Sequence, residues 1–144
     1  MIKLQVEKLI ELRDAYQEME AYAEVINKLK LQAMKITTII SEVPKNQSSV
    51  KDGIASPVIG IIMLEEEWKK LIYQWTQKRD AVIEEIKRLP NVKERAVLML
   101  RYVGVNTWEQ IANIMIISES TVFRIHKKAL RNYKNMIVNE SKKQ

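Results

Sequence analysis

The chain has 144 residues and a formal net charge of +6; 47% of its residues are hydrophobic, three are glycine, three are proline and none is cysteine. The missing thiols exclude a disulfide framework, a cysteine-ligated zinc site and a thiol nucleophile. Long stretches without glycine, proline or an alternating β-branched pattern argue against a sheet and predict an all-α fold, and the length fits one domain or one small domain plus an extension.

The first predicted element is a long N-terminal helix, residues 1–43, which we expect to mediate oligomerisation. Its apolar residues recur in steps of three and four, which is the spacing of a coiled-coil seam. Pro44 ends the pattern because proline has no backbone N–H for the next helical hydrogen bond. The seam consists of Leu9, Leu12, Tyr16, Met19, Tyr22, Ile26, Leu29, Ala33, Ile36, Ile40 and Val43.

A polar linker, residues 44–57, is predicted to lead into a second long helix, residues 58–90, which serves as a scaffold. This helix has a similar coiled-coil-like seam, so the two seams could be buried against each other or pair across a two-fold axis. The apolar run 54–64 is too short to span a bilayer, and no membrane contact is expected. The second seam consists of Leu64, Trp68, Leu71, Trp75, Val82, Ile86 and Leu89.

A three-helix helix-turn-helix domain is predicted next, over residues 91–136, and residues 137–144 are expected to be a flexible basic tail. The first helix of this domain should extend over residues 92–103 and end at Gly104.

The start signals of the other two helices of this domain are specific. Thr107 and Gln110 have the spacing of a capping box, and Ser118 is a favourable N-cap residue for the third helix, which should extend to about Asn135. Only about three residues separate the second helix from the third. The small Ala112 lets these helices cross closely, as they do in a DNA-binding helix-turn-helix.

The excess positive charge lies entirely in this C-terminal segment. Residues 1–57 carry 8 Lys and Arg against 8 Asp and Glu, residues 58–90 carry 6 against 6, and residues 91–144 carry 10 against 4. Because Lys and Arg bound to phosphates release condensed counterions, this asymmetry favours a nucleic-acid partner.

The outer face of the third helix is suited to double-stranded DNA. Side chains in its first two turns would reach base edges in the major groove, while later cations and the hydroxyls at the helix starts would contact phosphates. On this face the base-facing residues are predicted to be Glu119, Ser120, Thr121 and Arg124. The predicted phosphate contacts are Thr107, Ser118, Lys127, Lys128, Arg131 and Lys134.

Four short segments of this domain resemble region four of sigma-70-type factors, whose helix-turn-helix reads the −35 element of promoters. They are Leu98-x-x-Arg101-Tyr102, Thr107-Trp108-Glu109-Gln110-Ile111-Ala112, Ser118-x-x-Thr121-Val122 and Lys128-Ala129-Leu130-Arg131. Nothing resembles the promoter-melting region of a sigma factor. The layout, with its long helices, polar linker and terminal region-four-like domain, is more similar to phage-encoded late-transcription regulators of the RinA and ArpU type.

The resemblance to region four implies that Glu119, Ser120, Phe123 and Arg124 face bases. A polar residue is usual at the position of Phe123, which could contact a thymine methyl group or pack against the neighbouring helical scaffold. His126 is the single histidine. Since its lysine neighbours would repel a metal ion, it is expected on the surface or facing a phosphate.

Together these features predict a cytoplasmic, homodimeric transcription regulator of a bacterial host cell that binds double-stranded DNA, and by resemblance a phage late-gene activator. One alternative is a factor that binds host RNA polymerase or another protein, and another is a phage packaging protein such as a small terminase subunit. No nucleophile, metal-ligand set or glycine-rich phosphate loop is present, so an enzyme, a cofactor and a small-molecule substrate are not expected.

Overall fold

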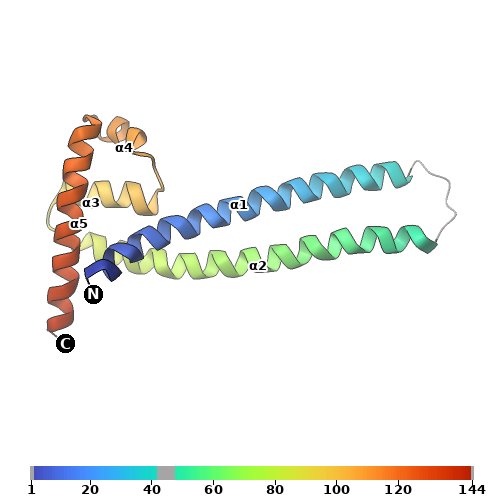
Figure 1. Cartoon of the computed structure of the whole chain (residues 1–144), viewed down its shortest axis with the longest axis horizontal. Helices are drawn as coiled ribbons and strands as arrows, with labels where there is room; N and C mark the ends of the chain where they lie inside the picture. Colours follow the sequence, from blue (N-terminus) through green and yellow to red (C-terminus); the bar gives the residue numbers. More distant parts are fainter. Residues whose placement is uncertain (1, 42–47, 144) are drawn as a thin grey trace. The chain divides into compact units, whose positions relative to one another are not determined.

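A computed structural model describes the backbone of residues 2–41 and 48–143 and the side chains of residues 6–36 and 58–143. Helices account for nearly all of the described backbone, and it contains no strand, which confirms the predicted all-α class (Figure 1). The helices are α1 (Ile2–Ser41), α2 (Ser48–Lys87), α3 (Val92–Leu98), the π-helical turn η1 (Met99–Val103), α4 (Trp108–Met115) and α5 (Glu119–Lys142).

The chain divides into two compact units, and the two long helices pass through both. One unit combines residues 1–16 with residues 75–144, and the other is residues 17–74. Among the described residues, no helix is both long and apolar enough to cross a membrane.

Residues 17–74 form a helical hairpin in which α1 and α2 lie side by side in opposite directions (Figure 1). Ile26 and Ile61 are buried between them. The indole Nε1 of Trp68 donates a hydrogen bond to the carbonyl of Met19 at 3.1 Å. The two predicted seams therefore contact each other within one chain.

Ile36, a predicted seam residue of α1, is exposed, and the side chains of Ile40 and Val43 lie outside those that the structure describes.

The second long helix begins ten residues earlier than predicted, at Ser48 instead of Val58. Residues 48–57 of the predicted linker are thus helical, and residues 42–47 lie outside the described chain. A polar composition does not prevent this extension. Once the apolar part of α2 has formed, most added residues gain a hydrogen bond without a new nucleation cost, although Pro57 has no N–H to donate to the carbonyl of Gly53.

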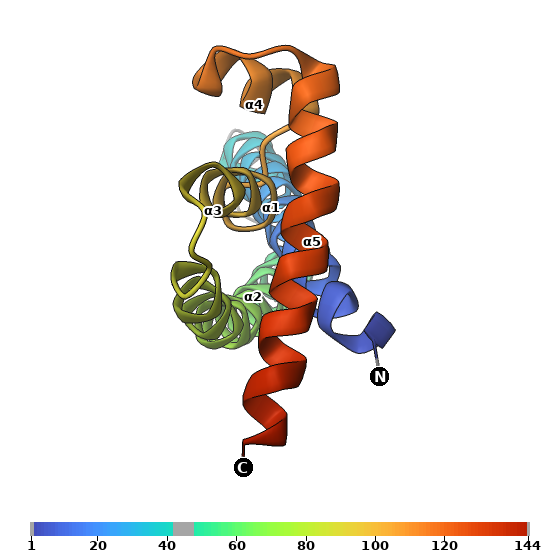
Figure 2. The same ribbon diagram turned by 90° about the vertical axis from the view of Figure 1, so that its left-hand side faces the viewer.

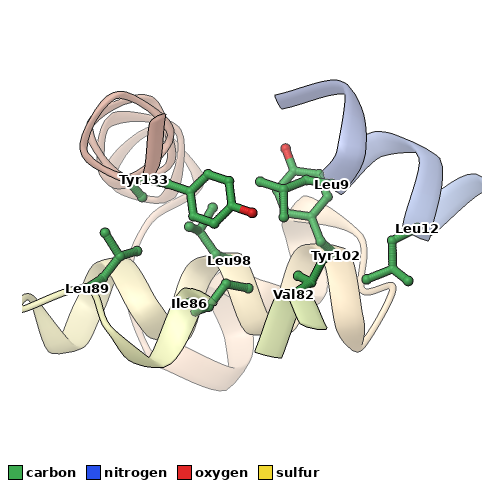
Figure 3. Close-up of a cluster of buried hydrophobic side chains, with 9 residues drawn as sticks. Leu9, Leu12, Val82, Ile86, Leu89, Leu98, Tyr102 and Tyr133 are labelled. Carbon is green, nitrogen blue, oxygen red and sulfur yellow. The ribbon is translucent and has the colours of Figure 1, made fainter. Parts of the chain in front are cut away.

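Residues 1–16 and 75–144 form a second unit, in which α5 crosses α3 and the adjoining ends of α1 and α2 (Figure 2). All these elements contribute to one core, so α5 is held by several helices at once (Figure 3). The buried residues of this core are Leu9, Leu12, Val82, Ile86, Leu89, Leu98, Tyr102, Ala129 and Tyr133.

Two carboxylates also fix α5 from its inner side. Glu85 of α2 accepts a hydrogen bond from the Tyr133 hydroxyl, and its other oxygen is 2.6 Å from Nζ of Lys8. Glu94 of α3 is only 3% exposed, and both of its oxygens accept hydrogen bonds at 2.9 Å from the side-chain amide of Asn132. These two carboxylates thus anchor the helix that was predicted to read DNA to α2 and α3.

The prediction of a flexible tail over residues 137–144 is wrong for most of that segment, because α5 continues to Lys142. Met136 and Ile137 pack against the core. Farther along, the carboxylate of Glu140 accepts two hydrogen bonds at 2.8 Å from the guanidinium of Arg88. These contacts supply the partners that keep the last turns helical.

The predicted helix 92–103 has the expected bounds, but its last turn is π-helical. The N–H of Gly104 donates to the carbonyl of Met99 at 2.8 Å, a bond between residues five apart. Gly104 accommodates a close approach: a Cβ there would lie 2.7 Å from the side-chain Nδ2 of Asn106 and 3.0 Å from the carbonyl oxygen of Leu100. The positive φ, 55°, falls on Val105 instead.

Candidate nucleic-acid interface

The helices α4 and α5 form a helix-turn-helix around a small buried cluster. Ile111 and Ala112 of α4 meet Val122 of α5 and Val97 of α3, all of them buried. Ala112 has the predicted role, since its small side chain lies at this crossing. The turn itself depends on Ile116, which adopts a left-handed conformation (φ 57°, ψ 50°) directly after α4.

Both predicted helix caps are present. Thr107 Oγ1 accepts from the N–H of Gln110 at 3.2 Å, and the Gln110 side chain accepts from the N–H of Thr107 at 2.9 Å, which completes the capping box. Ser118 Oγ accepts from the N–H of Thr121 at 3.2 Å. Exposed hydroxyls at two helix N-termini can donate to phosphate oxygens while they accept these N–H groups.

Most of the predicted DNA-binding residues of α5 are exposed on the side away from the core. Two are partly buried: Thr121, whose hydroxyl lies 2.8 Å from that of Ser118, and Lys134. The inner side of α5 is formed by Val122, Ala129 and Tyr133, all buried. The exposed residues are Glu119, Ser120, Phe123, Arg124, Lys127, Lys128 and Arg131.

The cations on this outer side are available for an external anion. Within the described part of the chain, no carboxylate forms a salt bridge with Arg124, Lys127, Lys128 or Arg131. By contrast, the ion pairs of this unit involve side chains elsewhere, such as Arg88 with Glu140. A row of unpaired cations on one helix gives a surface that attracts the phosphate backbone.

The sequence left open whether Phe123 faces DNA or packs against neighbouring helices, and in the structure its ring is partly packed and partly exposed. Its ring centroid is 5.0 Å from that of Trp108, so it packs against α4 of the helix-turn-helix itself. The side chain nevertheless remains 46% exposed. One part of the ring is therefore supported by protein, and the rest faces outward beside Arg124.

His126 is partly buried and its Nε2 is engaged within the protein, whereas the sequence prediction placed it on the surface or facing a phosphate. Its Nε2 is 2.6 Å from the hydroxyl of Tyr102, and its ring meets that of Trp108 edge-on, with centroids 4.6 Å apart. Burial, aided by the nearby positive charge of Arg101, lowers the pKa of His126 to about 4. The neutral imidazole is thus a packing and hydrogen-bonding group of α5 that contacts η1 and α4.

The sequence did not reveal the group of side chains that supports this part of α5. The guanidinium of Arg101 lies over the Trp108 ring, 3.9 Å from its centroid, and also donates to the carbonyl of Asn106 at 3.1 Å. The members of this group come from η1, α4 and α5. Short spacings along one helix cannot indicate such a cluster, because it forms only where the three elements cross.

Comparison with known proteins agrees with this geometry. Residues 87–135 match the family model of sigma-70 region 4, a helix-turn-helix DNA-binding domain. No curated protein and no solved structure matches the chain. The region-four match covers α3, η1, α4 and the part of α5 that carries the exposed cations.

Proposed function

We propose that this chain, whose residues 87–135 are a sigma-70 region 4 domain, is a transcription regulator that binds specific duplex DNA at promoters. The observation that carries the proposal is the outer side of α5, where unpaired cations lie on the second helix of a helix-turn-helix. This helix is the one that enters the major groove in such motifs.

The proposed contacts divide into two groups according to chemistry. In the first two turns of α5, Arg124 can donate two hydrogen bonds to a guanine, and Glu119 and Ser120 can accept from or donate to base edges. Farther along, Lys127, Lys128 and Arg131 would contact phosphates, with Thr107 and Ser118 at the helix starts. The first group would specify the sequence and the second would hold the domain in register.

A random library of DNA duplexes provides the direct test. The full chain should select a preferred sequence, and its affinity should fall steeply with salt, with log Kobs decreasing by about 0.9 per phosphate contact for each unit of log salt. Selection of no preferred sequence, or binding that is independent of salt, would contradict the proposal.

We further propose that the protein is a homodimer through its long helices. Several apolar side chains of the hairpin 17–74 remain exposed in one chain, including Leu31, Met34, Ile59, Ile62 and Met63. Burial of such residues against a second copy would remove them from water, and a closed two-fold pair buries the same surface on both copies.

Sedimentation of the full chain tests the dimer. A negative charge introduced into the exposed apolar surface, as in Met63→Glu, should shift the protein toward monomer, whereas Gln74→Glu, at an exposed position of the same helix, is the control with the same change in charge. A dimer should also select a split DNA site with regular spacing. A wild-type monomer at all concentrations would contradict the proposal, and ring-sized assemblies would favour the packaging protein instead.

The finer assignment, a phage late-gene activator in the cytoplasm of a bacterial host, rests on the similarity in layout to RinA- and ArpU-type regulators.

A second candidate function is docking onto host RNA polymerase. Ile114 of α4 and Ile116 of the turn are exposed apolar residues next to the proposed DNA interface, as a protein contact would require. Retention of polymerase by a variant with a neutralised α5 would favour this second function.

A further inference from the structure

We infer that Phe123 reads the 5-methyl group of a thymine in the bound DNA, and that Trp108 is the positioning residue that holds its ring. This inference rests on the proposed function, because it concerns the same face of α5.

The chemistry of Phe123 restricts what it can recognise. The phenyl ring has no hydrogen-bond donor or acceptor, so it can neither pair with a base edge nor hold a phosphate. In the major groove the one apolar feature that the bases present is the methyl group of thymine. Phe123 is 46% exposed, and the exposed residues Ser120 and Lys127 lie about one helical turn before and after it on the outer side of α5. Its ring therefore presents an apolar surface among polar groups.

The ring of Phe123 is held before any DNA is bound. Its centroid is 5.0 Å from that of Trp108, and the two planes are tilted by 57°. Trp108 is itself held on two sides, by the guanidinium of Arg101 at 3.9 Å and by the ring of His126 at 4.6 Å. The hydroxyl of Tyr102, 2.6 Å away, fixes His126 in turn.

This arrangement holds the Phe123 ring in one orientation before DNA binds. A side chain that is already immobilised loses little conformational entropy on binding, so more of the methyl contact is retained as affinity. Without Trp108, Phe123 would have no aromatic ring beside it on α4 and could adopt other rotamers. Trp108 therefore acts through Phe123, and its loss should weaken the response to one methyl group more than the general attraction to DNA.

Substitution of deoxyuridine for thymine tests this directly, since it removes the 5-methyl group and nothing else. In a duplex selected by the full chain, each thymine is replaced in turn and Kd is measured. For the wild-type protein, at least one replacement should raise Kd about fourfold, the effect expected for one buried methyl group. The same replacement should have no effect on Phe123→Ser, and a reduced effect on Trp108→Leu.

Two further variants complete the design. Trp108→Phe keeps an aromatic ring at the support position and should retain most of the deoxyuridine effect, so a folding defect in Trp108→Leu cannot obscure the result. Val92→Ala alters an exposed apolar residue of α3 and should leave the effect unchanged.

The outcomes separate this inference from the proposed function. If the chain selects a DNA sequence but no deoxyuridine replacement matters, or if the effect persists in Phe123→Ser, the inference is overturned and DNA recognition stands. The same holds if the selected site has no thymine. If the chain selects no sequence at all, the proposed function itself fails.

Discussion

The hydroxyl of Tyr102 and Nε2 of His126 are 2.6 Å apart, which joins η1 to the middle of α5. The bond requires a neutral imidazole if the tyrosine is to donate, and burial together with Arg101 favours this form by lowering the pKa of His126 to about 4. The ring next to it, Trp108, supports Phe123 on the outer side of the domain. The protonation of one buried residue is therefore linked to the face proposed to read DNA.

Acid should destabilise the protein through His126. In the unfolded chain this histidine has an ordinary pKa of 6.5, so as the pH falls below that value the unfolded state binds the proton first. The contribution of His126 to the free energy of unfolding should decline between about pH 6.5 and pH 4 and stay constant below pH 4. We expect a loss of about 2 kcal/mol, less than the full linkage value because the ring is partly exposed.

Urea unfolding at a series of pH values measures this loss. His126 is the only histidine, so the variant His126→Gln isolates its contribution from that of the carboxylates. The stability difference between wild type and variant should narrow as the pH falls through this range. A difference that does not change with pH would contradict the assignment of His126 as a buried neutral group.

Asn132→Ala should lower the free energy of unfolding strongly, although it truncates only one partly buried side chain. The amide of Asn132 is the hydrogen-bond donor to both oxygens of Glu94, which is 3% exposed. Its removal leaves a buried carboxylate without those bonds, at a cost of about 2–3 kcal/mol. Guanidinium unfolding should show this loss, whereas Asn135→Ala, at an exposed position of α5, should change stability little. Equal stabilities of the two variants would refute this role of Asn132.

Ile116→Asn should stabilise the protein. Ile116 has φ 57°, a left-handed conformation that is strained for a β-branched residue, and at 89% exposure its side chain gains little packing to offset that strain. Asparagine adopts this conformation more readily than a β-branched residue, and we expect a gain of about 1 kcal/mol. The melting temperature measures the gain. Ile114→Asn, an exposed change inside α4, is the control and should not raise it; a lower melting temperature for Ile116→Asn would count against backbone strain at the turn.

Arg124→Ala and Lys128→Ala should affect DNA binding in different ways. Arg124 lies in the base-facing turns of α5, so its loss should relax the sequence preference and cost about 1–3 kcal/mol on the selected site. Lys128 lies one turn later, and its loss should weaken all sequences alike and reduce the salt slope by about one contact.

Filter or fluorescence binding at several salt concentrations, with selected and scrambled duplexes, separates the two effects. Lys70→Ala, on the exposed surface of the hairpin 17–74, provides a control with the same loss of charge. Binding that is indifferent to both α5 variants would remove α5 as the recognition helix.

The local features of the region-four domain were predictable because their causes are local. The capping box of Thr107 and Gln110 and the N-cap Ser118 follow from hydrogen bonds between residues three apart, and the structure confirms both. The seam residues of the long helices follow from the helical period, and Ile26 and Leu12 are buried as predicted. The exposed cations of α5 follow from the same period, since its apolar residues determine which side faces the core.

Local sequence signals were therefore sufficient for the helical class, the starts of α3, α4 and α5, and the basic side of α5, but not for the start of α2. Contacts between helices account for the rest: the partial burial of His126, the support of Phe123 by Trp108, and the continuation of α5 to Lys142. Each of these depends on residues distant in sequence that meet only where helices cross. A periodic pattern shows which side of a helix is buried, but it cannot show which side chain lies opposite.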